Sequence, residues 1–138
     1  MAGDYPFLLP QADEETQPYW DGAKEGKLVL QRCSDCKTFR HPPQKVCSKC
    51  YSEESEWVPV SGKGTLYAYI FVHQPVLPQW HGHTPYNIAQ ISIDDAPGVR
   101  LTGNVVAEDE GRMKVGMPLQ VVFDRVTDDD VIPRWRLA

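Results

Sequence analysis

Four cysteines clustered between Cys33 and Cys50 constrain the fold of this 138-residue chain more than any other feature. Cys33 and Cys36 form one Cys-x2-Cys pair, and Cys47 and Cys50 form a second pair after the intervening stretch 37–46. Each pair is short enough to turn back on itself as a knuckle, and two knuckles supply the four thiolates of a tetrahedral zinc site. A thioredoxin-type redox pair would need a βαβ context that the sequence lacks, and disulfides would need a secreted protein. The doubled spacing therefore predicts a structural Zn2+ site with these four ligands.

A site of this kind is closed, because four protein ligands leave no coordination position for a catalytic water. It also uses every cysteine of the chain, since the sequence contains four. Any reaction that needs a thiol nucleophile must then take that group from another subunit.

The N-terminal segment 1–26 is predicted to form an extended arm followed by one short helix. Thr16 is expected to cap the helix, Pro18 to lie in its first turn and Gly26 to end it. Tyr19 and Trp20 each share a helical face with Ala23, at i+4 and i+3 spacing, and a helix this short is not stable alone. We therefore expect both aromatic side chains to be buried, either in the core of this chain or against a partner protein.

The rest of the chain reads as mainly β. A strand over 27–32 leads into the first knuckle, and the zinc ribbon is expected over 27–56. The acidic stretch 51–56 is the predicted boundary of a second module over 57–138. About five principal strands in this module favour a small closed barrel of the OB type, with a small sandwich as the alternative. The strands are expected at Trp57–Val60, Thr65–His73, Asn87–Ile93, Val99–Val106, Leu119–Val126 and Val131–Leu137.

One long connection, 74–86, contains three prolines, a tryptophan and two histidines. Long irregular loops in compact domains are often functional. Trp80 is predicted to act as a lid over the barrel or as an interface anchor. Tyr86, which opens the next strand, is a further candidate for binding a ligand or partner. His73, at the preceding strand end, is either a hydrogen-bonded structural residue or part of a partner's substrate channel. The nearby His-x-His pair has no suitable carboxylates, so we do not expect it to bind a metal.

Charge is distributed unevenly along the chain. Seven basic residues and two acidic residues lie between Lys24 and Cys50, so this segment carries +5 and the rest carries −10. Either these cations offset the charge of a zinc–thiolate cluster, or they form a seat for phosphates or an acidic partner. Arg40 and Lys45 are the candidate contacts. The barrel carries one basic residue, Arg100, between 64 and 106, which disfavours a barrel that binds single-stranded nucleic acid.

The order of these parts resembles a family of zinc-ribbon/OB-fold proteins that accompany thiolase-type enzymes, formerly described as a domain of unknown function. The similarity runs from Tyr19 to Phe123. It is carried by the doubled cysteine pairs, the Pro42-Pro43 step and the barrel motifs at residues 64–67, 101–104 and 115–118. The resemblance implies a rubredoxin-like zinc ribbon followed by an OB-fold barrel.

The same resemblance implies an accessory subunit that has no turnover of its own. Such proteins pair with thiolases or lipid-transfer-type aldolases in hetero-oligomers, help to hold or channel an acyl-CoA, and complete a site whose catalytic residues belong to the partner. The residues singled out above as candidates for binding a ligand or the partner are Tyr19, Trp20, Arg40, Lys45, His73, Trp80 and Tyr86. A nucleic-acid-binding ribbon and barrel is the alternative, and a small stand-alone hydrolase is a third hypothesis. Without a signal sequence or an apolar span, we expect a cytoplasmic protein.

Overall fold

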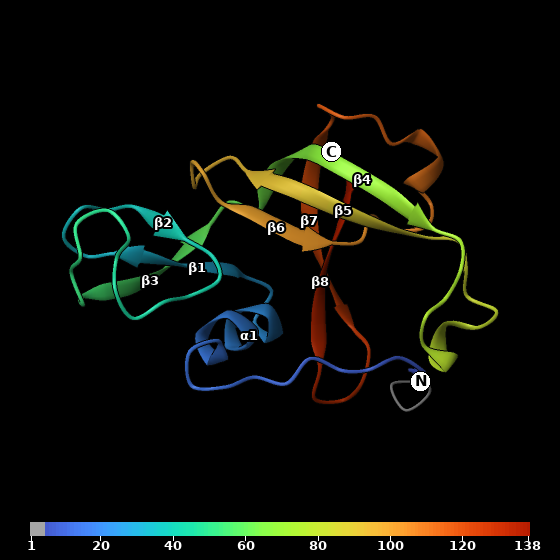
Figure 1. Cartoon of the computed structure of the whole chain (residues 1–138), viewed down its shortest axis with the longest axis horizontal. Coiled ribbons are helices and arrows are strands. Elements are labelled where there is room, and N and C mark those ends of the chain that lie inside the picture. The colour runs from blue at the N-terminus through green and yellow to red at the C-terminus, as the bar shows by residue number, and fades with distance from the viewer. Residues whose placement is uncertain (1–4) are drawn as a thin grey trace.

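The computed structural model describes residues 5–138, and it contains one short helix and eight strands in two sheets (Figure 1). The first four residues of the predicted arm lie outside the described residues. The ribbon and the barrel form the two ends of the molecule in the view of Figure 1, and α1 lies beneath the junction between them. The fold is therefore mainly β, as the sequence predicts. No helix in the described chain has the length and apolar character that a membrane crossing requires.

Helix α1 (Gln17–Lys24) begins and ends close to the predicted positions. Its end is a Schellman motif: Gly26 has a φ of 74°, and the N–H of Lys27 donates to the carbonyl of Gly22 at 2.9 Å. The predicted cap at Thr16 is wrong in detail. Thr16 occupies the cap position, but its hydroxyl bonds the carboxylate of Asp13 at 3.0 Å and makes no capping bond to the helix.

The ribbon sheet has the order β2-β1-β3, with β2 at Phe39–Arg40, β1 at Leu28–Cys33 and β3 at Ser55–Val60. Both neighbours run antiparallel to β1. Strand β3 pairs with β1 along its whole length, from Leu28 opposite Val60 to Cys33 opposite Ser55. The strand predicted at Trp57–Val60 as the start of the second module therefore belongs to the sheet of the ribbon. The division at residue 57 itself stays a prediction.

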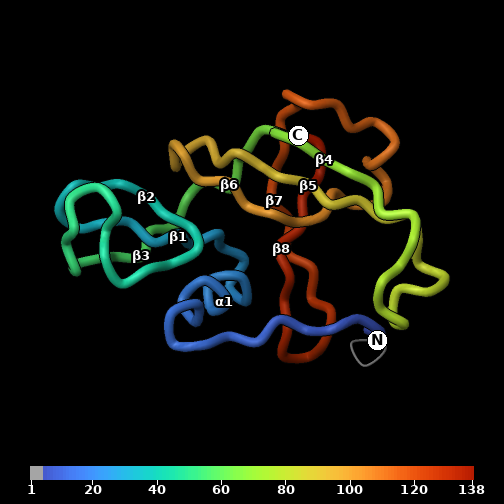
Figure 2. Tube along the Cα trace, viewed as in Figure 1, coloured from blue at the N-terminus to red at the C-terminus, as the bar shows by residue number. Residues whose placement is uncertain are grey.

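The second sheet has five antiparallel strands in the order β6-β5-β4-β7-β8. Its edges meet where Val105, just beyond β6, forms a parallel bridge with Trp135 of β8. Two backbone bonds hold this closure: Trp135 N–H to Asn104 O at 3.0 Å, and Val106 N–H to Trp135 O at 2.8 Å. The curled path of the chain in Figure 2 is therefore an OB-type barrel and not a sandwich. The strands are β4 at Lys63–Val72, β5 at Tyr86–Ile93, β6 at Arg100–Gly103, β7 at Pro118–Arg125 and β8 at Val131–Leu137.

The barrel core is tightly packed around Trp135, of which 1% is exposed. Leu66, Ile91 and Leu119 are buried with it. Gly64 allows β4 and β5 to approach closely here, since a Cβ at this position would lie 2.4 Å from Ile91 Cγ2 and 2.8 Å from the carbonyl oxygen of Ser92. The sequence alternation predicted these strands because one face of each is apolar.

Strand β6 is shorter than the predicted strand Val99–Val106. After Gly103 the backbone no longer pairs with β5, and the side chain of Asn87 takes the place of the missing strand. Its Nδ2 donates to the carbonyl of Val105 at 2.8 Å, and its Oδ1 accepts from the Val105 N–H at 2.7 Å. Because the Asn87 side chain satisfies the backbone of Val105, the chain can leave β5 at this point, turn toward β8 and close the barrel.

Candidate metal centre and ligand cavity

The four cysteines predicted as metal ligands converge at one end of the ribbon. Their sulfur atoms all lie within 4.8 Å of one another. Cys33 Sγ is 3.5 Å from Cys50 Sγ, and Cys36 Sγ is 3.6 Å from Cys47 Sγ. A zinc ion with sulfurs at about 2.3 Å would hold them about 3.8 Å apart, so the cluster has the size of a tetrahedral metal site. The residues present therefore fit a structural metal.

The two knuckles have the same backbone geometry. Lys37 and Tyr51, one residue beyond each pair, both have a φ of 62°, a left-handed value that non-glycine residues rarely adopt. Lys37 N–H donates to Cys33 O, and Tyr51 N–H donates to Cys47 O, each at 3.0 Å. The repetition of a costly conformation at equivalent positions indicates that the knuckles are shaped for the ligand set and not for packing.

Backbone N–H groups of the knuckles lower the pKa of two of the ligands, Cys33 and Cys47, whereas the neighbouring sulfur of Cys33 and burial raise the pKa of Cys50 to about 12. The N–H groups of Cys50 and Lys49 lower the pKa of Cys47 to about 6, and the Lys49 N–H lies 3.4 Å from Cys47 Sγ. A metal binds the thiolate and not the thiol, so this depression favours binding near neutral pH. Cys33 and Cys47 are buried, whereas Cys36 and Cys50 are exposed.

Most cations of the ribbon are paired within the chain. Arg32 and Lys37 both contact Glu56 Oε1, at 3.0 and 3.1 Å. Glu56 lies on β3, outside the basic segment between Lys24 and Cys50. The net positive charge of the folded ribbon is therefore smaller than the +5 of that segment. Arg32 and Lys37 are therefore less available to a phosphate group than their position in the sequence suggests. Lys45 lies 3.9 Å from Glu15, and Arg40 bonds Gln31 Oε1 at 2.6 Å and Gln44 O at 2.8 Å.

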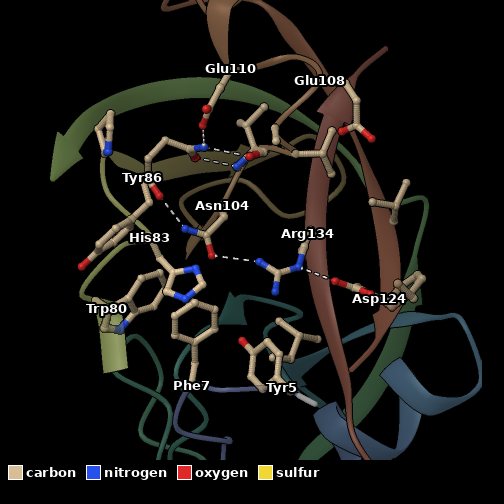
Figure 3. A pocket seen from close by; sticks show the side chains of 18 residues that line it. Tyr5, Phe7, Trp80, His83, Tyr86, Asn104, Glu108, Glu110, Asp124 and Arg134 are labelled. Atoms are coloured by element: carbon tan, nitrogen blue, oxygen red, sulfur yellow. Dashed lines mark hydrogen bonds and ion pairs between the residues drawn. The ribbon is translucent and has the colours of Figure 1, made fainter. Parts of the chain in front are cut away.

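A cavity of about 690 Å³ lies at the other end of the molecule (Figure 3). The N-terminal arm, the connection between β4 and β5, and the side of the barrel near the β6–β8 closure form its walls. The side chains that line it are mostly aromatic or aliphatic, with a few polar groups. They are Tyr5, Phe7, Trp80, His83, Pro85, Tyr86, Asn87, Asn104, Val105, Val106, Ala107, Glu108, Glu110, Val122, Phe123, Asp124, Ile132 and Arg134.

Three stacked rings form one wall of the cavity. The ring of Phe7 lies 3.8 Å from that of Trp80, and Trp80 lies 4.1 Å from Tyr86, with interplanar angles of 22° and 26°. His83 meets Phe7 edge-on at 5.1 Å, and Tyr5 meets it at 5.2 Å. Phe7 comes from the arm and Tyr86 begins β5, so the stack ties the arm to the barrel through Trp80, which ends the short 3₁₀ helix η2 (Pro78–Trp80).

A chain of polar side chains runs along the opposite wall (Figure 3). Asn87 donates to Glu110 Oε2 at 2.8 Å, and Asn104 donates to the carbonyl of Asn87. Arg134 links Asn104 Oδ1 at 3.3 Å to Asp124 Oδ2 at 2.8 Å. Each group is held by its neighbours, so the wall presents oriented amides and a neutralised guanidinium to the cavity. Such a wall suits recognition of a ligand by hydrogen bonds.

The structure brings together two of the predicted site residues that are not metal ligands, Trp80 and Tyr86. Tyr19 packs against the core, where burial raises its pKa to about 12, and it contacts the ring of Trp20 at 5.0 Å. Arg40 and Lys45 lie in the ribbon, and His73 lies just after β4 and does not line the cavity. The predicted site residues therefore fall into separate regions of the molecule.

Sequence reasoning missed Phe7, Asn104 and Arg134, which complete the cavity. Phe7 lies in a proline-flanked arm without periodicity, and nothing local connects it to a tryptophan in the second half of the chain. Asn104 was noticed only as part of a barrel motif. It alternates with Arg100 and Thr102 on the polar face of the predicted strand, so no local signal distinguishes it.

Two family descriptions match consecutive parts of the chain. Residues 20–56 match the rubredoxin-like zinc ribbon domain of ChsH2, and residues 57–124 match its C-terminal OB-fold domain. A solved structure described as "Ltp2-ChsH2(DUF35) aldolase" is similar with a TM-score of 0.81 and 30% identity, covering 93% of this chain and 98% of that one.

Three curated proteins are also similar. A probable enoyl-CoA hydratase alpha subunit of Thermomonospora curvata is 32% identical over 94% of this chain, which spans only 39% of that protein. A DUF35 domain-containing scaffold protein of Methanocaldococcus jannaschii is 36% identical over 74% of this chain and 71% of its own length. The benzoylsuccinyl-CoA thiolase subunit BbsA of Thauera aromatica is 29% identical over 66% and 56%. With both domains in the same order and relatives of this similarity, the chain belongs to the ChsH2/DUF35 family.

Proposed function

We propose that this chain is a non-catalytic subunit of a thiolase-fold acyl-CoA enzyme, either an aldolase or a thiolase. In this hetero-oligomer it helps to bind or channel the acyl-CoA and completes the active site of the partner. The observation that supports this most is the similarity over nearly its full length to a chain of the Ltp2-ChsH2 aldolase structure. Hydration of an enoyl-CoA is not part of this proposal, because this chain spans only 39% of the relative whose name includes that activity.

The residues of the cavity agree with an accessory role. No cysteine, serine or lysine is among its described lining residues, and its one histidine, His83, packs against Phe7. A nucleophile activated by a neighbouring base is the usual requirement for acyl transfer. In this proposal the cavity supplies shape and hydrogen bonds, and the partner supplies the groups that make and break bonds.

The charge of the cavity selects which part of an acyl-CoA it suits. Glu108, Glu110 and Asp124 line it against one cation, Arg134. Phosphates would be repelled there, whereas the uncharged part of the ligand would not. The same carboxylates disfavour the alternative of a single-stranded nucleic-acid groove, which needs cations along its length.

The metal in this proposal is Zn2+, bound by Cys33, Cys36, Cys47 and Cys50. It would fold the ribbon by joining the two knuckles, and its closed coordination gives it no part in the reaction. A cytoplasmic location belongs to the same proposal, because reduced thiols remain available to the metal there.

Co-expression with the thiolase-fold subunits of the same source tests the proposal. Each protein is purified alone and as a mixture, and thiolysis or aldol cleavage of acyl-CoA is measured for all three samples. We expect no turnover from this chain, little from the partner and full turnover from the complex. Equal turnover by the partner with and without this chain would contradict the accessory role.

A further inference from the structure

One part of the chain is free of formal charge. The stretch 64–93, enclosed by Lys63 and Asp94, has no aspartate, glutamate, lysine or arginine, and residues 5–12 of the arm contain none either. In the chain as a whole, 24% of residues are charged. Strands β4 and β5 have outward-facing positions where charged residues are usual in an antiparallel sheet with one solvated face. Their neutrality therefore requires a reason beyond the fold.

The same segments expose large apolar side chains. Among the described residues, nine such side chains are exposed, and six of them lie on these segments. Tyr67 and Ile70 lie on β4, Val76 and Leu77 lie between β4 and η2, and Leu8 and Leu9 lie on the arm. Val76 is 91% exposed and Leu8 is 68% exposed. We call these six residues the neutral surface.

The aromatic stack joins the two halves of the neutral surface. Leu8 follows Phe7 directly, Leu77 precedes Trp80 by three positions, and the rings of Phe7 and Trp80 are 3.8 Å apart. In Figure 1 the N-terminal end of the described arm lies beside the loop that carries η2. In the described part of the chain, no hydrogen bond fixes residues 5–12 to the barrel, so stacking is what holds the arm there.

We infer that the neutral surface is the face on which the thiolase-fold subunit docks; the identity of this partner rests on the proposed function. Interface cores are depleted in charged residues and enriched in aromatic ones, as this surface is. A charged partner face would lose its hydration here, and the Arg100 guanidinium is already engaged over the ring of Tyr67, 3.7 Å from its centre. The partner must therefore present an uncharged, apolar face. The six residues come from the arm, from β4 and from the connection that follows β4, so the surface spans three segments of the chain.

Two glutamate substitutions test the surface. Val76→Glu and Leu8→Glu place a carboxylate in each half of it, at positions exposed enough for the chain to fold normally. Val115→Glu is the control. Val115 is 65% exposed and lies in the loop before β7, which borders β4 through the Gly116 N–H and the Leu66 carbonyl but is not one of the uncharged segments. Affinity is measured by titrating each variant against the purified thiolase-fold subunit, after circular dichroism and zinc content confirm folding.

We expect Val76→Glu and Leu8→Glu to weaken the complex at least tenfold and Val115→Glu to bind like the wild type. Wild-type affinity in both surface variants would overturn this inference and leave the proposed function standing. An equal loss in Val115→Glu would also overturn it. A wild-type chain that binds no thiolase-fold subunit would overturn the proposed function and this surface together. A wild-type homodimer that Val76→Glu dissociates would replace the proposed partner by a second copy.

Discussion

The side-chain amide of Asn87 pairs with the backbone of Val105 through two hydrogen bonds, at 2.8 and 2.7 Å, as one strand pairs with another. Asn87 is 3% exposed, so neither partner has water as an alternative. The pair stands where β6 leaves β5 and the chain crosses to β8. A single amide therefore supports both the closure of the barrel and the polar wall of the cavity.

Replacing this amide is expected to destabilise the barrel. Asn87→Leu leaves the N–H and the carbonyl of Val105 buried without partners, which costs roughly 2–4 kcal/mol. The free energy of unfolding, measured by urea denaturation, is expected to fall by this amount. Gln90→Leu is the control on the same strand, since Gln90 is exposed, and it should change stability by less than about 0.5 kcal/mol. If Asn87→Leu also changed the free energy of unfolding by less than about 0.5 kcal/mol, the barrel would not depend on this amide.

Removal of the metal is expected to unfold the ribbon. Cys47→Ser takes away a buried ligand, and without the metal the four sulfurs have nothing to hold the knuckles together. We expect zinc content to fall from one ion per chain to nearly none, with a lower thermal midpoint. Ser48→Ala, an exposed residue between the second pair, should keep the metal. Retention of zinc and of the midpoint in Cys47→Ser would refute the four-ligand site.

Asp109 is expected to link stability to acid. The N–H of Leu137, at 2.8 Å, and the guanidinium of Arg112 hold the pKa of this carboxyl below its ordinary value of 3.8. A depressed pKa gives stability that is present above pH 3.8 and is lost as pH falls through the folded value. Asp109→Asn should therefore be less stable than the wild type at pH 7.

The difference between the two proteins should shrink as pH falls below 3.8, because the wild-type carboxyl then becomes protonated. Denaturant midpoints of both proteins, measured between pH 7 and pH 3, provide the test. Asp95→Asn is a suitable comparison. The wild-type Asp95 carboxylate accepts the Ser61 N–H but has no cation partner in the described chain. A difference between wild type and Asp109→Asn that is independent of pH would rule out this linkage.

The aromatic stack is expected to order the arm and the 74–85 loop without supporting the barrel core. Phe7→Ala removes the ring on Trp80, and each aromatic pair contributes about 0.5–1.5 kcal/mol beyond its buried area. We expect faster amide hydrogen exchange in residues 74–85 and easier quenching of tryptophan fluorescence, with an unchanged thermal midpoint. Leu8→Ala changes the exposed neighbour and should leave both signals as they are. Unchanged exchange in Phe7→Ala would mean that the loop is ordered without the arm.

The sequence predicted what depends on local spacing. The ligands Cys33 and Cys47 were found because a knuckle is complete within a few residues, and strands such as Val131–Leu137 because burial alternates along them. Contacts between distant residues without periodicity were not predictable. Phe7 meets Trp80 although the two lie far apart in the sequence, and Arg32 meets Glu56 only because β3 returns beside β1. The cavity is built from such contacts, so its two predicted residues could not indicate its extent.

The link between β3 and β4 has a mechanical consequence. Only Ser61 and Gly62 separate these strands, and both are anchored: Ser61 N–H bonds Asp95 Oδ2 at 2.6 Å, and Gly62 O accepts from Val121 N–H at 2.9 Å. A connection this short and this well tied leaves the ribbon little freedom to swing. If one partner bound to the ribbon and another to the barrel, this rigid link would fix the distance and the orientation between the two partners.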